Sequence, residues 1–140
     1  MKKKILFLGD GIYLKNLIRL YRKNIYDRFL IYHKTNLHKK SNFKKTFEVN
    51  LLEKSRIYNI AKKLKIDHVI TDQNDFAMGS YGFLCTKLKL KGIPFNICKR
   101  FTDKKNCREF LKKKKIFKNN LPKFYLSHEK IPNYLKKKKF

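Results

Sequence analysis

The sequence contains no tryptophan and only two alanines and two valines among 140 residues. Lysine, by contrast, occurs 31 times and arginine six times, and isoleucine, asparagine, phenylalanine and tyrosine are abundant. The residues in excess are those with AT-rich codons. We therefore interpret much of this composition as a consequence of genomic base composition.

The chain also lacks any long apolar run. Its start, MKKKILFLGDG, has a basic segment followed by only four consecutive apolar residues, 5–8, before Gly9. A signal peptide has an apolar region of ~7–15 residues, and a membrane-spanning helix needs ~20. Neither is predicted, so we expect a cytoplasmic protein that has no membrane partner.

Cysteine is scarce, with Cys85, Cys98 and Cys107 widely spaced and forming no CxxC pair. This pattern indicates neither a zinc site nor a disulfide framework, and we expect buried or idle thiols. The histidines have no partner four residues away and no acidic relay in view. No catalytic residue and no metal ligand is therefore predicted. The histidines are His33, His38, His68 and His128.

Acidic residues are few, ten against 37 basic ones, which gives a formal net charge of +27. Such a charge would ordinarily indicate nucleic acid or an anionic surface as partner. The base-composition explanation weakens that reading, and the aromatic residues recur at core spacing instead of forming an exposed stacking strip. A basic, non-enzymatic module that binds RNA or another polyanion is thus the alternative, and nucleic acid is not the expected partner.

Short apolar runs alternate with amphipathic segments along most of the chain. Hydrophobic residues make up 42% of it, enough for a packed core. The alternation predicts an α/β fold with a mostly parallel sheet and helices on both faces. The predicted strands are residues 4–8, 28–32, 46–50, 67–71 and 93–97; the predicted helices are 14–21, 53–64, 76–90 and 103–115, the last capped by Thr102; residues 121–126 form a predicted extended segment before a basic tail.

Two polar segments directly follow predicted strands, at the edge where ligands bind in open α/β sheets. The first is a glycine-rich turn that permits close backbone approach, and the second is the cluster TDQND. The alternatives are a plain tight turn for the first, and loop solubility with helix capping for the second. A dinucleotide site is disfavoured because Leu14 replaces the third glycine of GxGxxG. The candidate binding residues are Gly9, Asp10, Gly11, Asp72, Asn74 and Asp75.

Three segments occur in a familiar order: KILFLGDG, then IDHVITDQNDFAMGSYGFLCTKLKLKGIPFN, then FTDKKNCREFLKKKKI with LPKFY. Over about residues 3 to 126 the chain resembles the N-terminal region of ATP-grasp enzymes, in particular carbamoyl-phosphate-synthase-like carboxylate–amine ligases. The resemblance implies a Rossmann-like preATP-grasp domain at 1–99, followed at 100–140 by the first helix and strand of a truncated ATP-grasp domain.

In that family ATP activates a carboxylate as an acyl phosphate, which an amine then captures. The resemblance implies that Lys104, in the FTDK-like motif, contacts an ATP phosphate. It also implies that a small carboxylate or amine substrate meets the loops at 9–11 and 72–75. ATP and Mg²⁺ are implied for the full-length enzyme, but neither is expected to bind tightly to this chain alone.

We expect a fragment, a truncated gene product or one piece of a split enzyme, because the two ATP-grasp subdomains require well over a hundred further residues. Phosphoryl transfer depends on positioning and on metal-assisted charge neutralisation, which Lys104 alone does not provide. The chain is therefore expected to be inactive alone, with a separate chain that carries the missing subdomains as a candidate partner. A third reading is a regulatory or nucleotide-binding domain that uses only the Gly9–Gly11 turn.

Overall fold

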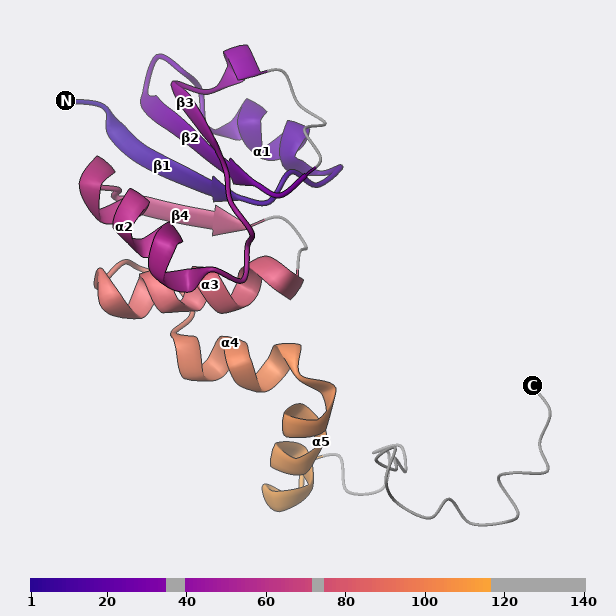
Figure 1. Cartoon of the computed structure of the whole chain (residues 1–140). Coiled ribbons are helices and arrows are strands. Elements are labelled where there is room, and N and C mark those ends of the chain that lie inside the picture. Colours follow the sequence, from indigo (N-terminus) through magenta and orange to yellow (C-terminus); the bar gives the residue numbers. More distant parts are fainter. Residues whose placement is uncertain (35–39, 72–74, 117–140) are drawn as a thin grey trace. The chain divides into compact units, whose positions relative to one another are not determined.

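In the part of the chain that the structure describes, four strands form one parallel sheet in the order β3-β2-β1-β4 (Figure 1). The computed structural model describes residues 1–34, 40–71 and 75–116. The predicted α/β architecture is confirmed, and the strands at 4–8, 28–32, 46–50 and 67–71 are found within two residues of their predicted bounds. The strands are β1 (Lys3–Leu8), β2 (Tyr26–Tyr32), β3 (Lys45–Glu48) and β4 (His68–Thr71).

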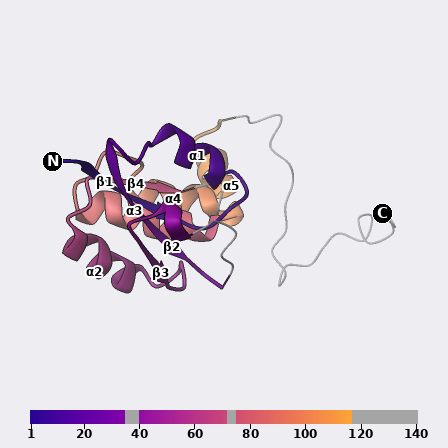
Figure 2. The same ribbon diagram turned by 90° about the horizontal axis from the view of Figure 1, so that it is seen from above.

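Helices cover both faces of this sheet, as predicted, and Figure 2 shows α1 and α2 on opposite sides of the strands. The apolar side chains of α1 join one core cluster, whereas those of α2 and α3 join the other. The helices are α1 (Leu14–Leu20), α2 (Lys54–Leu64), α3 (Asp75–Lys87), α4 (Phe95–Thr102) and α5 (Lys104–Lys113), with a short 3-10 turn, η1, at Lys40–Asn42.

The central strand β1 contributes to both clusters, because successive side chains of a strand point to opposite faces. Ile5 and Phe7 pack with the side chains of α1, and Leu6 and Leu8 pack with those of α2 and α3. All four are at most 1% exposed. The continuous apolar run that predicted a buried parallel strand is therefore covered on both faces of the sheet, as such a strand requires.

The chain divides into two compact units, Met1–Cys107 and Arg108–Phe140. The sheet, the helices α1 to α4 and the residues that line the cavities at both edges of the sheet belong to the first unit. The predicted extended segment at 121–126 and the basic tail lie outside the described residues, and the domain boundary near residue 99 stays a prediction. Within the described parts of the chain, no helix is long and apolar enough to cross a membrane.

The predicted strand at 93–97 is wrong, because this segment leads into α4. Pro94, with φ −70° and ψ 157°, stands just before the helix, where a missing N–H costs nothing. The first free N–H, that of Phe95, donates to Oγ1 of Thr86 in α3 at 3.0 Å. A short apolar run with one proline is too short to show either a strand or a helix periodicity. Packing against α3 therefore determines that this segment becomes a helix.

The predicted N-cap of α5 is also corrected. Thr102 is the last residue of α4, and its hydroxyl donates to the carbonyl oxygen of Cys98 at 2.9 Å. Asp103 is the capping residue instead: its Oδ1 accepts the N–H of Asn106 at 3.0 Å. A carboxylate at this position satisfies an N–H that the helix leaves open.

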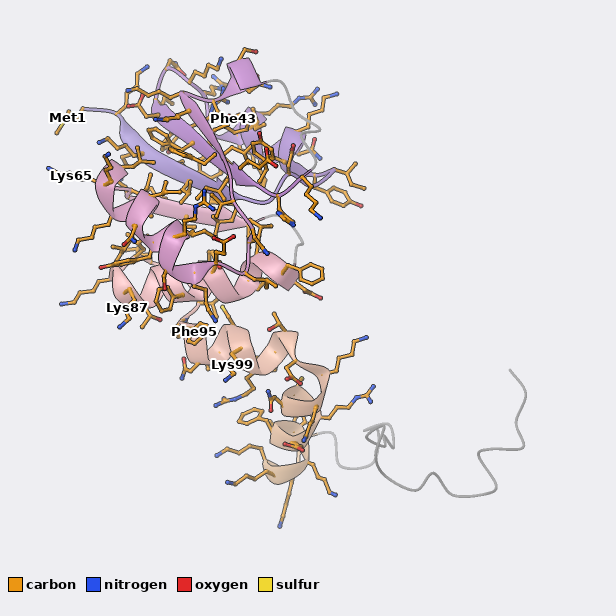
Figure 3. The ribbon with its side chains drawn as sticks, in the orientation of Figure 1. Met1, Phe43, Lys65, Lys87, Phe95 and Lys99 are labelled. Carbon is orange, nitrogen blue, oxygen red and sulfur yellow. The ribbon has the colours of Figure 1, made fainter. Side chains whose placement is uncertain are left out.

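Helices α3 and α4 approach closely at Gly82, and Figure 3 shows Phe95 where α4 begins beneath α3. A Cβ atom at residue 82 would lie 2.7 Å from Sγ of Cys98 and 2.9 Å from the Cα atom of Phe95. Nothing lies within 4 Å of the corresponding position at Gly79 in the same helix. The same substitution thus meets opposite environments one turn apart.

We predict that Gly82→Ala lowers the free energy of unfolding by about 1–3 kcal/mol, because the added methyl group overpacks the α3–α4 contact. Gly79→Ala is the matched control and should raise stability by about 0.5–1 kcal/mol through helix propensity alone. Urea unfolding followed by circular dichroism measures both. Equal effects of the two substitutions would show that the close contact is absent.

The buried thiols give a second prediction. Burial raises the pKa of both Cys85 and Cys98, whereas Cys107 is partly exposed. Because only the thiolate reacts, iodoacetamide at about pH 8 should modify Cys107 first. Peptide mapping by mass spectrometry measures the three rates, and urea should make them equal. Native labelling of Cys85 or Cys98 as fast as that of Cys107 would contradict the packing of α3 on α4.

Candidate functional site

The carboxyl ends of the four parallel strands meet at one edge of the sheet. From β1 the chain moves outward through β2 to β3, and then returns to place β4 on the other side of β1. The connection after β1 leads to α1 on one face, and that after β4 leads to α3 on the other. The strand order therefore reverses between β1 and β4, which is where open α/β sheets bind ligands.

The turn after β1 lies on one side of this switch point. Gly9 has φ 92°, a conformation that side chains disfavour, and its N–H donates to the carbonyl oxygen of Ile31 at 2.9 Å. Asp10 is buried, with 8% of its surface exposed, and the Gly11 carbonyl oxygen accepts the N–H of Leu14 at 3.1 Å. The predicted glycine turn thus connects the central strand directly to α1.

The segment after β4 begins beside that turn. Leu8 and Thr71 are partners in the β1–β4 register, and the Thr71 hydroxyl donates to the Leu8 carbonyl oxygen at 3.0 Å. The arrowheads of β1 and β4 lie side by side in Figure 1. This bond fixes the ends of the two strands together, so the two predicted binding segments start from neighbouring points.

Two of the predicted residues in the second segment, Asp72 and Asn74, lie outside the described residues. Asp75 is described: it is the exposed first residue of α3 and the acidic residue of its first turn. A carboxylate there is favoured by the helix dipole. Of the candidate set, the structure therefore places the glycine turn and Asp75 along the same edge of the sheet.

A cavity of about 380 Å³ adjoins Asp75 at this edge. Apolar side chains dominate its wall, and a carboxylate and two hydroxyls provide polar groups, the composition usual for small-molecule sites. The sequence did not indicate the α4 part of this wall, because residues 93–97 were expected to be a strand. The lining residues are Thr71, Asp75, Met78, Ile93, Ile97, Cys98, Phe101 and Thr102.

A second cavity of about 400 Å³ lies along the same edge and is lined by His33, Asn50, Leu51, Leu52 and Phe76. These residues follow β2, follow β3 or begin α3. Asn50 Oδ1 accepts the Leu52 N–H at 3.0 Å and so shapes the loop. His33 is exposed and lines this cavity. Its position directly after β2 was the sequence signal that could have marked it as a cavity residue.

Lys104 is the first residue of α5 and is exposed. It does not line either cavity at the carboxyl edge, so the structure does not bring it together with Asp75. Its proposed contact with an ATP phosphate stays a prediction. Among the described residues, no group of three or more His, Cys, Asp or Glu side chains could hold a metal ion.

No protein-family model matches the sequence, and no curated protein matches it. Solved structures do match the fold. The crystal structure of phosphoribosylglycinamide synthetase from Anaerococcus prevotii aligns with a TM-score of 0.71 over 81% of this chain, at 21% sequence identity. That of L-amino acid ligase from Bacillus licheniformis aligns with a TM-score of 0.65 over 80% of it, at 14% identity.

This chain spans 29% and 30% of the lengths of those two proteins. At such identities the likeness concerns the fold. The predicted Rossmann-like α/β fold is confirmed at this level, because this chain shares its fold with part of each of these two proteins.

Proposed function

We propose that this chain supplies the N-terminal, substrate-side domain of an ATP-dependent carboxylate–amine ligase. The observation that carries the proposal is the switch point between β1 and β4. There the Gly9–Gly11 turn and the segment leading to Asp75 start side by side, joined by the bond from Thr71 to Leu8. A small substrate would bind at this edge, in the cavity that Asp75 lines.

The chemistry of the edge suits an amine that carries an apolar group. The Asp75 carboxylate would accept hydrogen bonds from a substrate ammonium group, while Met78, Ile97 and Phe101 in the cavity wall would contact the apolar part. Asp72 and Asn74 are proposed to complete the polar contacts. One of the solved structures that share the fold is an L-amino acid ligase, so amino acids are the first substrates to test.

In the proposed ligase, ATP supplies the phosphoryl group that activates the carboxylate. Lys104 is the residue of this chain that we assign to an ATP phosphate, since an exposed ammonium at the start of a helix can reach a bound anion. The described residues contain no cluster suited to Mg²⁺, so no metal step is assigned to them. We propose that a separate chain or further subdomains provide that part of the reaction.

Binding of L-amino acids to the 140-residue chain tests the substrate edge. We expect L-leucine or L-phenylalanine to bind more tightly than glycine, and Asp75→Asn to weaken this binding about tenfold, because a charged hydrogen bond is lost. Isothermal titration calorimetry measures both. The matched control is Asp67→Asn, at the opposite edge of the sheet, which should leave binding unchanged. Equal losses in the two variants would argue against a site at Asp75.

We further predict that the purified chain alone forms no ADP from ATP in the presence of amino acids. Phosphoryl transfer requires positioned phosphates and charge neutralisation, for which Lys104 is insufficient. A coupled assay for ADP release measures the activity. ATP-dependent ligation by this chain without a partner would contradict the proposal that a separate chain or further subdomains are needed for catalysis. The proposed substrate site at Asp75 is tested separately, by the binding experiment.

A further inference from the structure

A third cavity lies at the opposite edge of the sheet, where the strands begin. Figure 3 shows Met1 and Lys65, which stand just before the starts of β1 and β4, on the same side of the sheet. The cavity has a volume of about 260 Å³ and is far from the switch point in the register of the strands. Its lining residues are Lys2, Lys23, Tyr26, Asp27, Arg28, Asn42, Phe43 and Lys44.

The wall of this cavity carries four cationic side chains and one carboxylate. Lysines are so common in this chain that three of them together carry little information. Arg28 is different. Among the described residues, only Asp10, Arg28 and Ser80 are polar and buried, and Arg28 is 5% exposed. Buried guanidinium groups are rare unless they are paired, so this one requires an explanation.

The partners of Arg28 satisfy only part of its hydrogen-bonding capacity. Its Nη1 donates to the carbonyl oxygens of Ile18 at 2.9 Å and Tyr21 at 3.3 Å, at the end of α1. Its Nε is enclosed and has no hydrogen-bond partner in the described parts of the chain. Burial lowers the pKa of Arg28 from its ordinary value, yet a guanidinium stays charged in proteins. A positive charge is therefore held beneath the cavity.

The lysines around the cavity are held in place by bonds to backbone oxygens. Lys2 Nζ donates to the Lys23 carbonyl oxygen at 2.7 Å, and Lys23 Nζ in turn donates to the Ser41 carbonyl oxygen. Each ammonium has three donors, so each keeps donors for a ligand. Lys44 Nζ contacts Asp27 Oδ2 at 2.7 Å. Asp27 therefore offsets Lys44, and the cavity retains an excess of positive charge.

We propose that this cavity binds a phosphate group, either inorganic phosphate or the phosphate monoester of a small molecule. A dianion matches the excess charge better than a carboxylate does, and arginine and lysine are the usual phosphate-binding side chains. The volume lies below the ~300–1,000 Å³ of typical ligand pockets, which favours a small ligand. The site is independent of the ligase function proposed above, because it occupies the other edge of the sheet.

Calorimetric titration of the 140-residue chain tests this site with sodium phosphate, glycerol 3-phosphate and sodium chloride at constant ionic strength. Constant ionic strength is needed because salt screens every exposed lysine. We expect saturable binding of one phosphate per chain and none of chloride. Tighter binding of glycerol 3-phosphate would identify a phosphorylated small molecule as the ligand, and tighter binding of inorganic phosphate would identify the free ion. Equal heats with phosphate and chloride would overturn the proposal.

Variants locate the site. The double variant Lys2→Gln with Lys44→Gln should weaken phosphate binding about tenfold. The control, Lys63→Gln with Lys99→Gln, has the same net charge but alters exposed residues outside the cavity, and should leave binding unchanged. Asp27→Asn should tighten binding about two- to fivefold, because it removes a competing carboxylate. Misfolding does not produce tighter binding. Equal weakening in both double variants, or no gain in Asp27→Asn, would overturn the assignment.

Discussion

The burial of β1 on both faces is the constraint on which the rest of the structure depends. Each of Ile5, Leu6, Phe7 and Leu8 is almost entirely enclosed, and fully burying one such side chain stabilises the fold by about 1.5–3 kcal/mol. Enclosure on two faces requires helices on both sides and a strand on each edge of β1. Once β2 and β3 occupy one edge, β4 must take the other, and the switch point beside Gly9 follows from that placement.

The fold was predictable where the local sequence pattern of a segment by itself indicates how that segment is buried. The run ILFL predicts a buried strand because no other common element hides four consecutive apolar residues so compactly. The segment at Pro94 carries no such information. Whether this segment becomes a strand or a helix depends on two residues of α3: Thr86, which accepts its first N–H, and Gly82, which has no side chain and so lets the helix approach. The local sequence pattern of residues 93–97 does not reveal this contact between two helices.

The candidate site divides in the same way. Gly9 and Asp75 were predictable because they follow strands, and strand ends determine where loops converge. The cavity walls were not, since Phe101 and Ile97 reach the edge only when residues 95–102 form a helix. The third cavity, at the edge where the strands begin, was not predicted for another reason. Arg28 has the sequence position of an ordinary strand residue, and its burial depends on carbonyl groups at the end of α1.

The net charge of the chain is less informative about function than the few charged side chains that have defined contacts in the structure. Several lysines lie over aromatic rings, for example Lys62 over Tyr58 and Lys87 over Phe83. Those rings are thereby engaged within the fold and do not form a free strip on which bases could stack. The enclosed charge of Arg28, by contrast, keeps its significance in a chain rich in lysine.

The two edges of the sheet differ in how a ligand would act on the protein. The amino edge is tied by side chains: Asp67 accepts the Lys4 N–H at 2.7 Å, and Lys4 Nζ donates to the Leu64 carbonyl oxygen at 2.9 Å. A ligand there adds to contacts that already hold strands and helices together, so its effect falls mainly on stability. At the carboxyl edge, Thr71 Oγ1 donates to the Leu8 carbonyl oxygen, and Ser80 Oγ in α3 donates to the carbonyl oxygen of Leu51 in the loop after β3. The residues that line the two cavities there come from loops, helices and the end of β4, and not from the buried strand β1. Substrate contacts can therefore vary there without disturbing the core that β1 organises.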